Sequence, residues 1–126
     1  MTYILGISAY YHDSAAALIK NGIVISAAQE ERFTRIKHDK SFPLESINFI
    51  LKDNSITLNQ IDAVVFYEKP YLKFKRLLKT YIDFFPKGLE FFLSSFVKSF
   101  QKKLFLERDI IFNLKKIDSN YKKKKI

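Results

Sequence analysis

The chain has 126 residues and no cysteine, which allows one modest domain and excludes disulfide bonds, thiolate metal sites and a cysteine nucleophile. Its formal net charge of +9 is unevenly placed, because residues 1–68 hold 6 basic and 8 acidic side chains whereas residues 69–126 hold 16 basic and 5 acidic ones. No uncharged apolar stretch reaches the roughly 18 residues that would span a bilayer, and the chain opens without a basic and apolar leader. These features predict a cytoplasmic protein that divides near Glu68 into two chemically different regions.

Three short strands are predicted at the start of the chain. Residues 3–8 form a nearly continuous apolar run, which is typical of a central strand buried on both faces. A polar segment leads to a second predicted strand over residues 15–20, and a third follows over residues 23–30. Asn21-Gly22 stands between the last two and is the strongest two-residue hairpin signal, so these two strands are predicted to pair antiparallel.

A loop, a helix and a fourth strand are predicted next. Residues 31–39 are mostly charged and predict a loop with Phe33 as its candidate for burial. Pro43 suits the start of a helix, and apolar residues recur at helical spacing for about ten residues after it. Residues 61–67 return as an apolar strand, and the crossover is long enough to place it parallel to the first.

Beyond Pro70 the pattern is helical. Residues 72–82, 86–105 and about 104–116 are predicted as three helices, and the second, opened by Pro86, carries a stripe of Phe and Leu with lysines alongside. Core packing within a larger enzyme is one interpretation of the stripe, and a membrane surface or a partner helix is the other. The final lysine run has no cap and no turn chemistry, so it predicts a solvated tail that does not return to a core.

Two blocks of residues match a known family in order and spacing. The first runs from Ile4 to Leu18 and includes His12-Asp13-Ser14, and the second comprises residues 30–35 and Lys37-His38-Asp39. Together they resemble the N-terminus of the carbamoyltransferases of nodulation and antibiotic tailoring, and the basic helices after Glu68 are similar to those of bacterial members. The resemblance therefore covers essentially the whole chain.

The resemblance implies an α/β fold of the ribonuclease H-like or actin-like kind. Residues 1–67 would be the opening β-β-β-α-β unit of an actin-like carbamoyltransferase domain, and residues 68–126 a basic, aromatic-rich helical segment of the same incomplete domain. Because Ser8 stands at the end of the first strand and Asp13 comes later, the phosphate-binding turn expected of actin-like ATPases is only partly present. A turn of this kind still offers backbone amides to a phosphate or adenylate group.

The resemblance also implies an activity. Such enzymes use carbamoyl phosphate, ATP and a divalent metal to form carbamoyl-adenylate, and then transfer the carbamoyl group to an acceptor hydroxyl. A histidine cluster that family members carry just after a strand start similar to residues 123–126 would hold the metal, so no cofactor is expected for this chain alone. The chain is expected to be an inactive fragment on its own, with a separately encoded remainder of the enzyme as one candidate partner.

Within this resemblance, His12 and Asp13 are the candidate catalytic residues. An imidazole with a near-neutral pKa can take a proton from an acceptor hydroxyl, and a neighbouring carboxylate can orient the ring. The alternative interpretation is that Asp13 caps the turn through its own backbone while His12 is merely exposed.

A second set of candidates would bind substrate. Cationic side chains suit phosphate and adenylate oxygens, and the set comprises Ser14, Arg32, Arg35, Lys37 and His38. The alternative is a solvated loop that pairs with Glu30 and Glu31. These two residues could also form a carboxylate pair for acid/base work, but at most one would enter a site because neighbours at a strand end point to opposite faces. Two histidines without a clear third ligand do not predict a metal site.

The sequence also allows a function from another class. The chain would then be a small non-enzymatic protein that uses its basic aromatic helices on a membrane or a partner. Nucleic acid is not the expected partner, because the basic tail lacks a reading helix or an aromatic sheet. Either way, the Phe-rich helices are expected to expose apolar surface and to promote oligomerisation when the chain is expressed alone.

Overall fold

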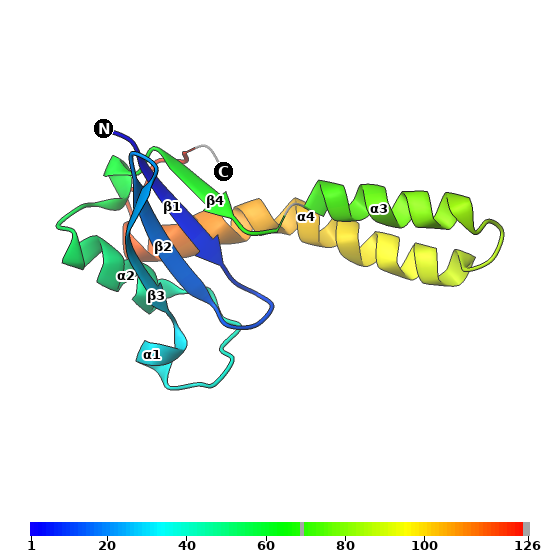
Figure 1. The fold of residues 1–126 in the computed structure, drawn as a ribbon, viewed down its shortest axis with the longest axis horizontal. Helices are drawn as coiled ribbons and strands as arrows, with labels where there is room; N and C mark the ends of the chain where they lie inside the picture. Colours follow the sequence, from blue (N-terminus) through cyan, green and yellow to red (C-terminus); the bar gives the residue numbers. More distant parts are fainter. Residues whose placement is uncertain (69, 125–126) are drawn as a thin grey trace. The chain divides into compact units, whose positions relative to one another are not determined.

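The computed structural model of the chain describes residues 1–68 and 70–124 and shows two compact units (Figure 1). The first unit combines residues 1–67 with residues 110–126, and the second comprises residues 68–109. The division after residue 67 coincides with the change in charge along the sequence. Residues 110–124, however, group with the strands, although the sequence pattern places them with the basic helices.

The first unit is built on a four-stranded mixed sheet. Its strands are β1 (Tyr3–Ser8), β2 (Ala15–Lys20), β3 (Ile23–Gln29) and β4 (Ala63–Phe66), in the spatial order β3-β2-β1-β4. Strand β1 pairs antiparallel with β2 and parallel with β4, while β2 and β3 form an antiparallel hairpin. The predicted hairpin, the central place of the first strand and its parallel partner are therefore confirmed.

The core lies on one face of this sheet. Leu5 and Ile7 of β1 and Ala16 and Leu18 of β2 are buried, whereas the residues between them are partly exposed, as the two-residue period of a strand requires. The prediction that the first strand is buried on both faces is therefore wrong within this unit. Gly6 is the reason that the run looks continuous in sequence, because it stands on the open face without presenting a polar side chain.

The turn between β2 and β3 requires a left-handed backbone. Asn21 has φ 49° and Gly22 has φ 86°, and the Asn21 side chain also accepts a hydrogen bond of 2.9 Å from the Thr2 amide. A Cβ atom at Gly22 would meet no atom within 4 Å. A side chain at position 22 would therefore cost free energy through the backbone conformation and not through a steric clash.

We expect Gly22→Ala to lower the free energy of unfolding by about 1 kcal/mol, because an L-residue with a side chain pays for the left-handed conformation. Gly6→Ala is the matched control, since its Cβ would lie 3.7 Å from the Ala17 carbonyl, an ordinary contact, in extended backbone. Urea unfolding of the two variants measures the difference. Equal destabilisation of both would contradict the assignment of strain to the turn.

Two helices follow the hairpin. The loop predicted over residues 31–39 is wrong at its start, where α1 (Glu31–Thr34) forms a single turn that ends at Arg35 in the left-handed conformation. The next helix, α2 (Leu44–Asp53), confirms the predicted ten-residue helix after Pro43 and buries Ile47, Ile50 and Leu51. A short 3-10 turn, η1 (Leu58–Gln60), then leads into β4.

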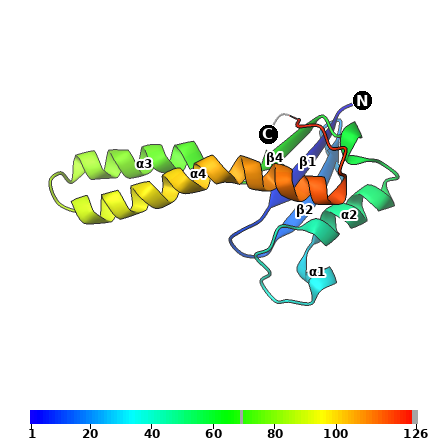
Figure 2. The ribbon, with the colours of Figure 1, turned by 180° about the vertical axis from the view of Figure 1, so that it is seen from behind.

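The C-terminal part of the chain covers the same face of the sheet as α2. The C-terminal part of helix α4 (Leu89–Ile117) lies on this face (Figure 2). Its Ile110 and Leu114 side chains are fully buried. Tyr121 is buried as well, and the Lys122 amide donates a 3.3 Å hydrogen bond to the Asn59 side chain. Tyr121 therefore returns to the core, contrary to the prediction for the end of the chain, whereas Lys122 and Lys123 of the lysine run that follows are exposed, as predicted for a solvated tail. The last lysine of the run lies outside the described part.

The second unit is a helical hairpin. Helix α3 (Pro70–Asp83) and the N-terminal part of α4 are joined by a turn that contains Pro86, and the Tyr81 and Phe92 rings stack with centroids 4.3 Å apart. The sequence predicted a helix opening at Pro86 and a break near residue 104. Both predictions are wrong, because Gly88 (φ 84°) delays the helix to Leu89 and no Gly or Pro interrupts residues 89–117.

Several large apolar side chains of the second unit are exposed. Those around the turn are the most exposed, at 67% for Phe84, 68% for Phe85 and 71% for Phe91. The expectation of exposed phenylalanines is thus met within this unit. Neither α3 nor α4, over the residues described, has the length and apolar character needed to cross a bilayer.

Candidate functional site

The loop between β1 and β2 is held at both ends by the segment that follows α1. The Tyr10 amide donates to the Lys40 carbonyl and the Ser14 amide to the Asp39 carbonyl, each at 2.9 Å. The Ser14 hydroxyl also donates to the Ser41 carbonyl. The residues between these two anchors, which include His12, therefore lie on a loop whose two ends are held in place by hydrogen bonds.

Three side chains meet at the tip of this loop. Asp13 Oδ2 lies 2.7 Å from Nδ1 of His12, and Asp13 Oδ1 lies 2.8 Å from Nδ1 of His38. Both rings are more than half exposed, at 56% and 61%. We refer to His12, Asp13 and His38 as the His–Asp–His cluster.

Backbone conformation explains how adjacent residues come to face one another. Asp13 has φ 53° and His38 has φ 57°, both in the left-handed region that residues with a Cβ seldom adopt. At Asp13 this conformation directs the carboxylate toward the ring of His12 and also toward His38, which lies on the loop after α1. Strained residues of this kind persist where the surrounding structure holds them and are frequent at functional sites.

The electrostatics of the cluster define its proton positions. The hydrogen bonds from His38 and then from His12 lower the pKa of Asp13, partly opposed by desolvation, so that Asp13 is ionised at neutral pH. A carboxylate can only accept, so each ring donates its Nδ1–H. In the neutral imidazole the lone pair then lies on Nε2, and none of the described residues forms a hydrogen bond with Nε2 of either ring.

The lowered pKa of Asp13 predicts a contribution to stability that depends on pH. A carboxylate whose pKa is lower in the folded than in the unfolded chain stabilises the fold above its ordinary pKa of 3.8, and this stabilisation is lost as the pH falls through the folded value. We expect Asp13→Asn to narrow the difference in urea midpoint between pH 7 and pH 3. Asn tolerates the left-handed conformation, and Asp53→Asn, on the exposed end of α2, serves as the control. An unchanged pH profile would contradict the pairing.

The other predicted site residues take different places. Ser14 is 1% exposed and its hydroxyl is used within the protein. Arg32, Arg35 and Lys37 are exposed, and in the described part of the chain no hydrogen bond or ion pair joins them to the His–Asp–His cluster. Of the predicted substrate-binding set, His38 is the residue that the fold brings directly to Asp13.

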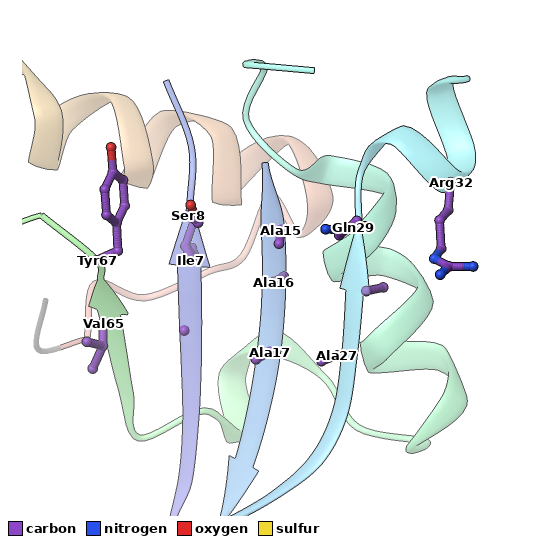
Figure 3. Close-up of a pocket in the computed structure, with 12 residues that line it drawn as sticks. Ile7, Ser8, Ala15, Ala16, Ala17, Ala27, Gln29, Arg32, Val65 and Tyr67 are labelled. Carbon is purple, nitrogen blue, oxygen red and sulfur yellow. The ribbon is translucent and has the colours of Figure 1, made fainter. Parts of the chain in front are cut away.

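Arg32 borders a pocket on the open face of the sheet. The pocket has a volume of about 510 Å³, and its floor is formed by small residues such as Ala15 and Ala17 (Figure 3). Val65 and Tyr67 line it on the β4 side, and Gln29 and Arg32 line it near the end of β3 (Figure 3). Its surface is therefore mainly apolar, with a guanidinium at one border.

Two buried carboxylates, Glu30 and Asp39, lie in the segments next to the cluster and were not predicted as site residues. Glu30 is 2% exposed and accepts hydrogen bonds from the Glu45 amide and from the amide and hydroxyl of Ser46. The alternative interpretation in which Glu30 pairs with the basic loop is therefore wrong.

Asp39 is 7% exposed and accepts hydrogen bonds from Thr34 and Ser41. The spacing of Thr34, Asp39 and Ser41 was the available sequence signal, since Asp and Ser commonly bond to nearby backbone.

The described residues do not form a metal site. Both Nδ1 atoms of the His–Asp–His cluster are turned to the carboxylate, and over residues 1–68 and 70–124 no group of three or more His, Asp or Glu side chains is arranged to hold an ion. The residues present do not fit the metal that the family resemblance implies.

Comparison with known proteins places the whole chain in one family. The family model described as "Carbamoyltransferase N-terminus" matches residues 3–126. The uncharacterized protein sll1178 of Synechocystis sp. is 56% identical over 107 residues, which are 85% of this chain and 17% of that protein. The chain thus spans about a sixth of the length of this relative.

Two further relatives match shorter stretches of the chain. Nodulation protein NolNO of Sinorhizobium fredii is 41% identical over 58 residues, which are 46% of this chain and 8% of that protein. The uncharacterized protein MJ1051 of Methanocaldococcus jannaschii is 38% identical over 53 residues, 42% of this chain and 10% of that protein. With the family model matched over residues 3–126, the chain belongs to the carbamoyltransferase N-terminus family.

Proposed function

We propose that this chain forms the front part of a carbamoyltransferase that transfers a carbamoyl group from carbamoyl phosphate, through carbamoyl-adenylate, to the hydroxyl of an acceptor. The observation that carries the proposal is the shared carboxylate of Asp13, which accepts Nδ1–H of both His12 and His38. An imidazole held in this way has its Nε2 lone pair available as a general base, as in the Asp–His pairs of hydrolytic enzymes.

The chemistry needs one proton acceptor of this kind. The acceptor hydroxyl attacks the carbonyl carbon of carbamoyl-adenylate while Nε2 of His12 takes the hydroxyl proton, and the carbamate C–O bond forms. The bond between the carbonyl carbon and the phosphate oxygen then breaks, and adenylate leaves with the electron pair. Asp13 stabilises the imidazolium that this step creates, because its negative charge lies 2.7 Å from the protonated ring.

His12 is the better placed of the two rings to be this base. It stands between the two anchors of the β1–β2 loop, at Tyr10 and Ser14, whereas His38 lies on the second loop. We assign His38 the task of fixing the second oxygen of Asp13, so that the carboxylate keeps one orientation. Arg32, Arg35 and Lys37 are assigned to the phosphate and adenylate oxygens, since exposed cations are free to meet an anionic substrate.

At the level of the fold, we propose that the first unit is the opening of an actin-like domain. The strand order β3-β2-β1-β4, with β4 parallel to β1 and the other pairs antiparallel, supports this assignment. The chain matches 17% of the Synechocystis relative. We therefore assign the handling of ATP, the metal and the formation of the adenylate to residues beyond these 126, on the same polypeptide or on a separately encoded partner.

The experiment compares the 126-residue chain alone with the same chain co-expressed with whatever polypeptide the adjoining DNA encodes. Carbamoyl phosphate-dependent consumption of ATP and carbamoylation of hydroxyl acceptors are the measurements. We expect both reactions only when the remainder is present. Turnover by the isolated chain would contradict its role as a front part, and an adjoining sequence without any effect on either reaction would contradict the proposed function.

A further inference from the structure

We infer that Asp39 is a positioning residue of this site, which fastens the loop bearing His38 to the loop bearing His12 and Asp13. The inference rests on the proposed function, since it assigns Asp39 a task in assembling the His–Asp–His cluster. Asp39 does not touch any ring of the cluster. It acts through the two loops that carry them.

The Asp39 side chain closes its own loop. Oδ1 accepts hydrogen bonds from the amide of Ser41 at 2.8 Å and from its hydroxyl at 2.6 Å, while Oδ2 accepts from the Thr34 hydroxyl at 2.7 Å. These bonds lower the pKa of Asp39 and keep it ionised at neutral pH. Hydrogen bonds to a charged acceptor are about twice as strong as neutral ones, so the single carboxylate ties the last residue of α1 to the segment before α2.

The backbone beside Asp39 then holds the other loop. Three consecutive carbonyls, those of Asp39, Lys40 and Ser41, accept from the Ser14 amide, the Tyr10 amide and the Ser14 hydroxyl respectively. Tyr10 stands two residues before His12, and Ser14 directly follows Asp13. The short segment that the Asp39 hydrogen bonds hold therefore anchors both ends of the β1–β2 loop, which carries His12 and Asp13.

His38 immediately precedes Asp39, and its position depends on the same closure. Its backbone is left-handed at φ 57°, a conformation that costs about 1 kcal/mol for a residue with a side chain. Its amide donates to the Glu31 carboxylate at 3.2 Å, and its ring reaches Asp13 at 2.8 Å. If the Asp39 bonds were lost, the loop would be free to relax this conformation and His38 would leave Asp13.

The test is Asp39→Asn, with Asp118→Asn as the matched control. Asp118 also accepts from the amide two residues ahead, at Asn120, and from a side chain, Asn59, but lies outside both loops. The measurements are made by NMR on the labelled 126-residue chain. They are the pKa of the Asp13 carboxyl, followed through its ¹³C shift, and the tautomer of each ring, followed through its ¹⁵N shifts.

In Asp39→Asn we expect the pKa of Asp13 to rise toward its ordinary value of 3.8 and the His38 ring to lose its fixed Nδ1–H tautomer. Asp118→Asn is expected to change neither. Amide spectra of the strands show whether the fold persists. A folded Asp39→Asn chain with the wild-type Asp13 pKa and His38 tautomer would overturn the inference.

Should Asp39→Asn unfold the chain, Ser41→Ala and Thr34→Val each remove a single donor and give smaller shifts in the same direction. Absence of any shift in both variants would equally overturn the inference. None of these readings uses turnover. An assembled cluster in a protein without carbamoyl transfer would thus refute the proposed function and leave the role of Asp39 intact.

Discussion

Replacing His12 by Gln is expected to lower the rate of carbamoyl transfer by about 10²- to 10⁴-fold, the usual contribution of a general base. Gln preserves the approximate size of the ring and can still donate a hydrogen bond to Asp13, but it cannot take the proton of the acceptor hydroxyl. The measurement is kcat/KM for the hydroxyl acceptor in the preparation that supports turnover. Lys52→Gln, on the exposed surface of α2, is the control and should match the wild type.

The same assay separates the two rings of the cluster. If His12 is the base and His38 the orienting group, His38→Gln should retain more activity than His12→Gln, because the amide can still donate to Asp13. The acidic limb of the pH–rate profile, which reports protonation of the base, should also persist in His38→Gln and vanish in His12→Gln. The reverse pattern would exchange the two roles, and wild-type rates in both variants would exclude the cluster from catalysis.

The strands and the first long helix were readable from sequence because local signals agree there. Asn21-Gly22 selects a hairpin. The burial of one face of β1, with Leu5 and Ile7 inside, was not predicted, because the nearly continuous apolar run over residues 3–8 hides the two-residue period. Local signals failed in α4. A helix boundary was predicted near residue 104, where neither Gly nor Pro stands, and α4 continues through this position.

The candidate site was readable only in part for a related reason. His12, Asp13 and His38 were all singled out as residue types, but their meeting depends on left-handed backbone at Asp13 and His38 and on a loop 25 residues away in the chain. No periodicity encodes such a contact. Glu30 was considered only as half of an acid/base pair with Glu31 or as an ion-pair partner of the charged loop, because a carboxylate at a strand end gives no sign in the sequence that it will be buried under a helix.

The helix that Glu30 supports begins without a cap of its own. Pro43 precedes α2 and makes no side-chain bond to it, so the first amides of the helix depend on a carboxylate from the end of β3. Glu30 accepts from the Glu45 amide at 3.0 Å and from the Ser46 amide and hydroxyl at 2.8 and 2.6 Å. A negative charge at a helix N-terminus is also favoured by the helix dipole.

We therefore expect Glu30→Ala to lower the free energy of unfolding by about 3 kcal/mol or more, because burying an unsatisfied donor costs about 1–3 kcal/mol and this change leaves several. Glu30→Gln keeps the shape and one acceptor oxygen and should cost less. Glu45→Ala, an exposed change in the same helical turn, should cost only a few tenths of a kcal/mol, about the value of a surface charge near a helix N-terminus. Urea unfolding measures all three variants.

The consequences of Glu30→Ala should extend to the His–Asp–His cluster. The Glu30 amide donates a 2.8 Å hydrogen bond to the carbonyl of Ser14, the residue directly after Asp13. A change that makes the end of β3 more mobile therefore also weakens one anchor of the β1–β2 loop. Where the Glu30→Gln chain remains folded, its Asp13 carboxyl should keep its lowered pKa, because that backbone bond is retained. Equal free energies of unfolding for Glu30→Ala and Glu45→Ala would show that α2 is capped by some other group. Glu30 would then not connect the end of β3 to α2, and no effect on the His–Asp–His cluster would be expected.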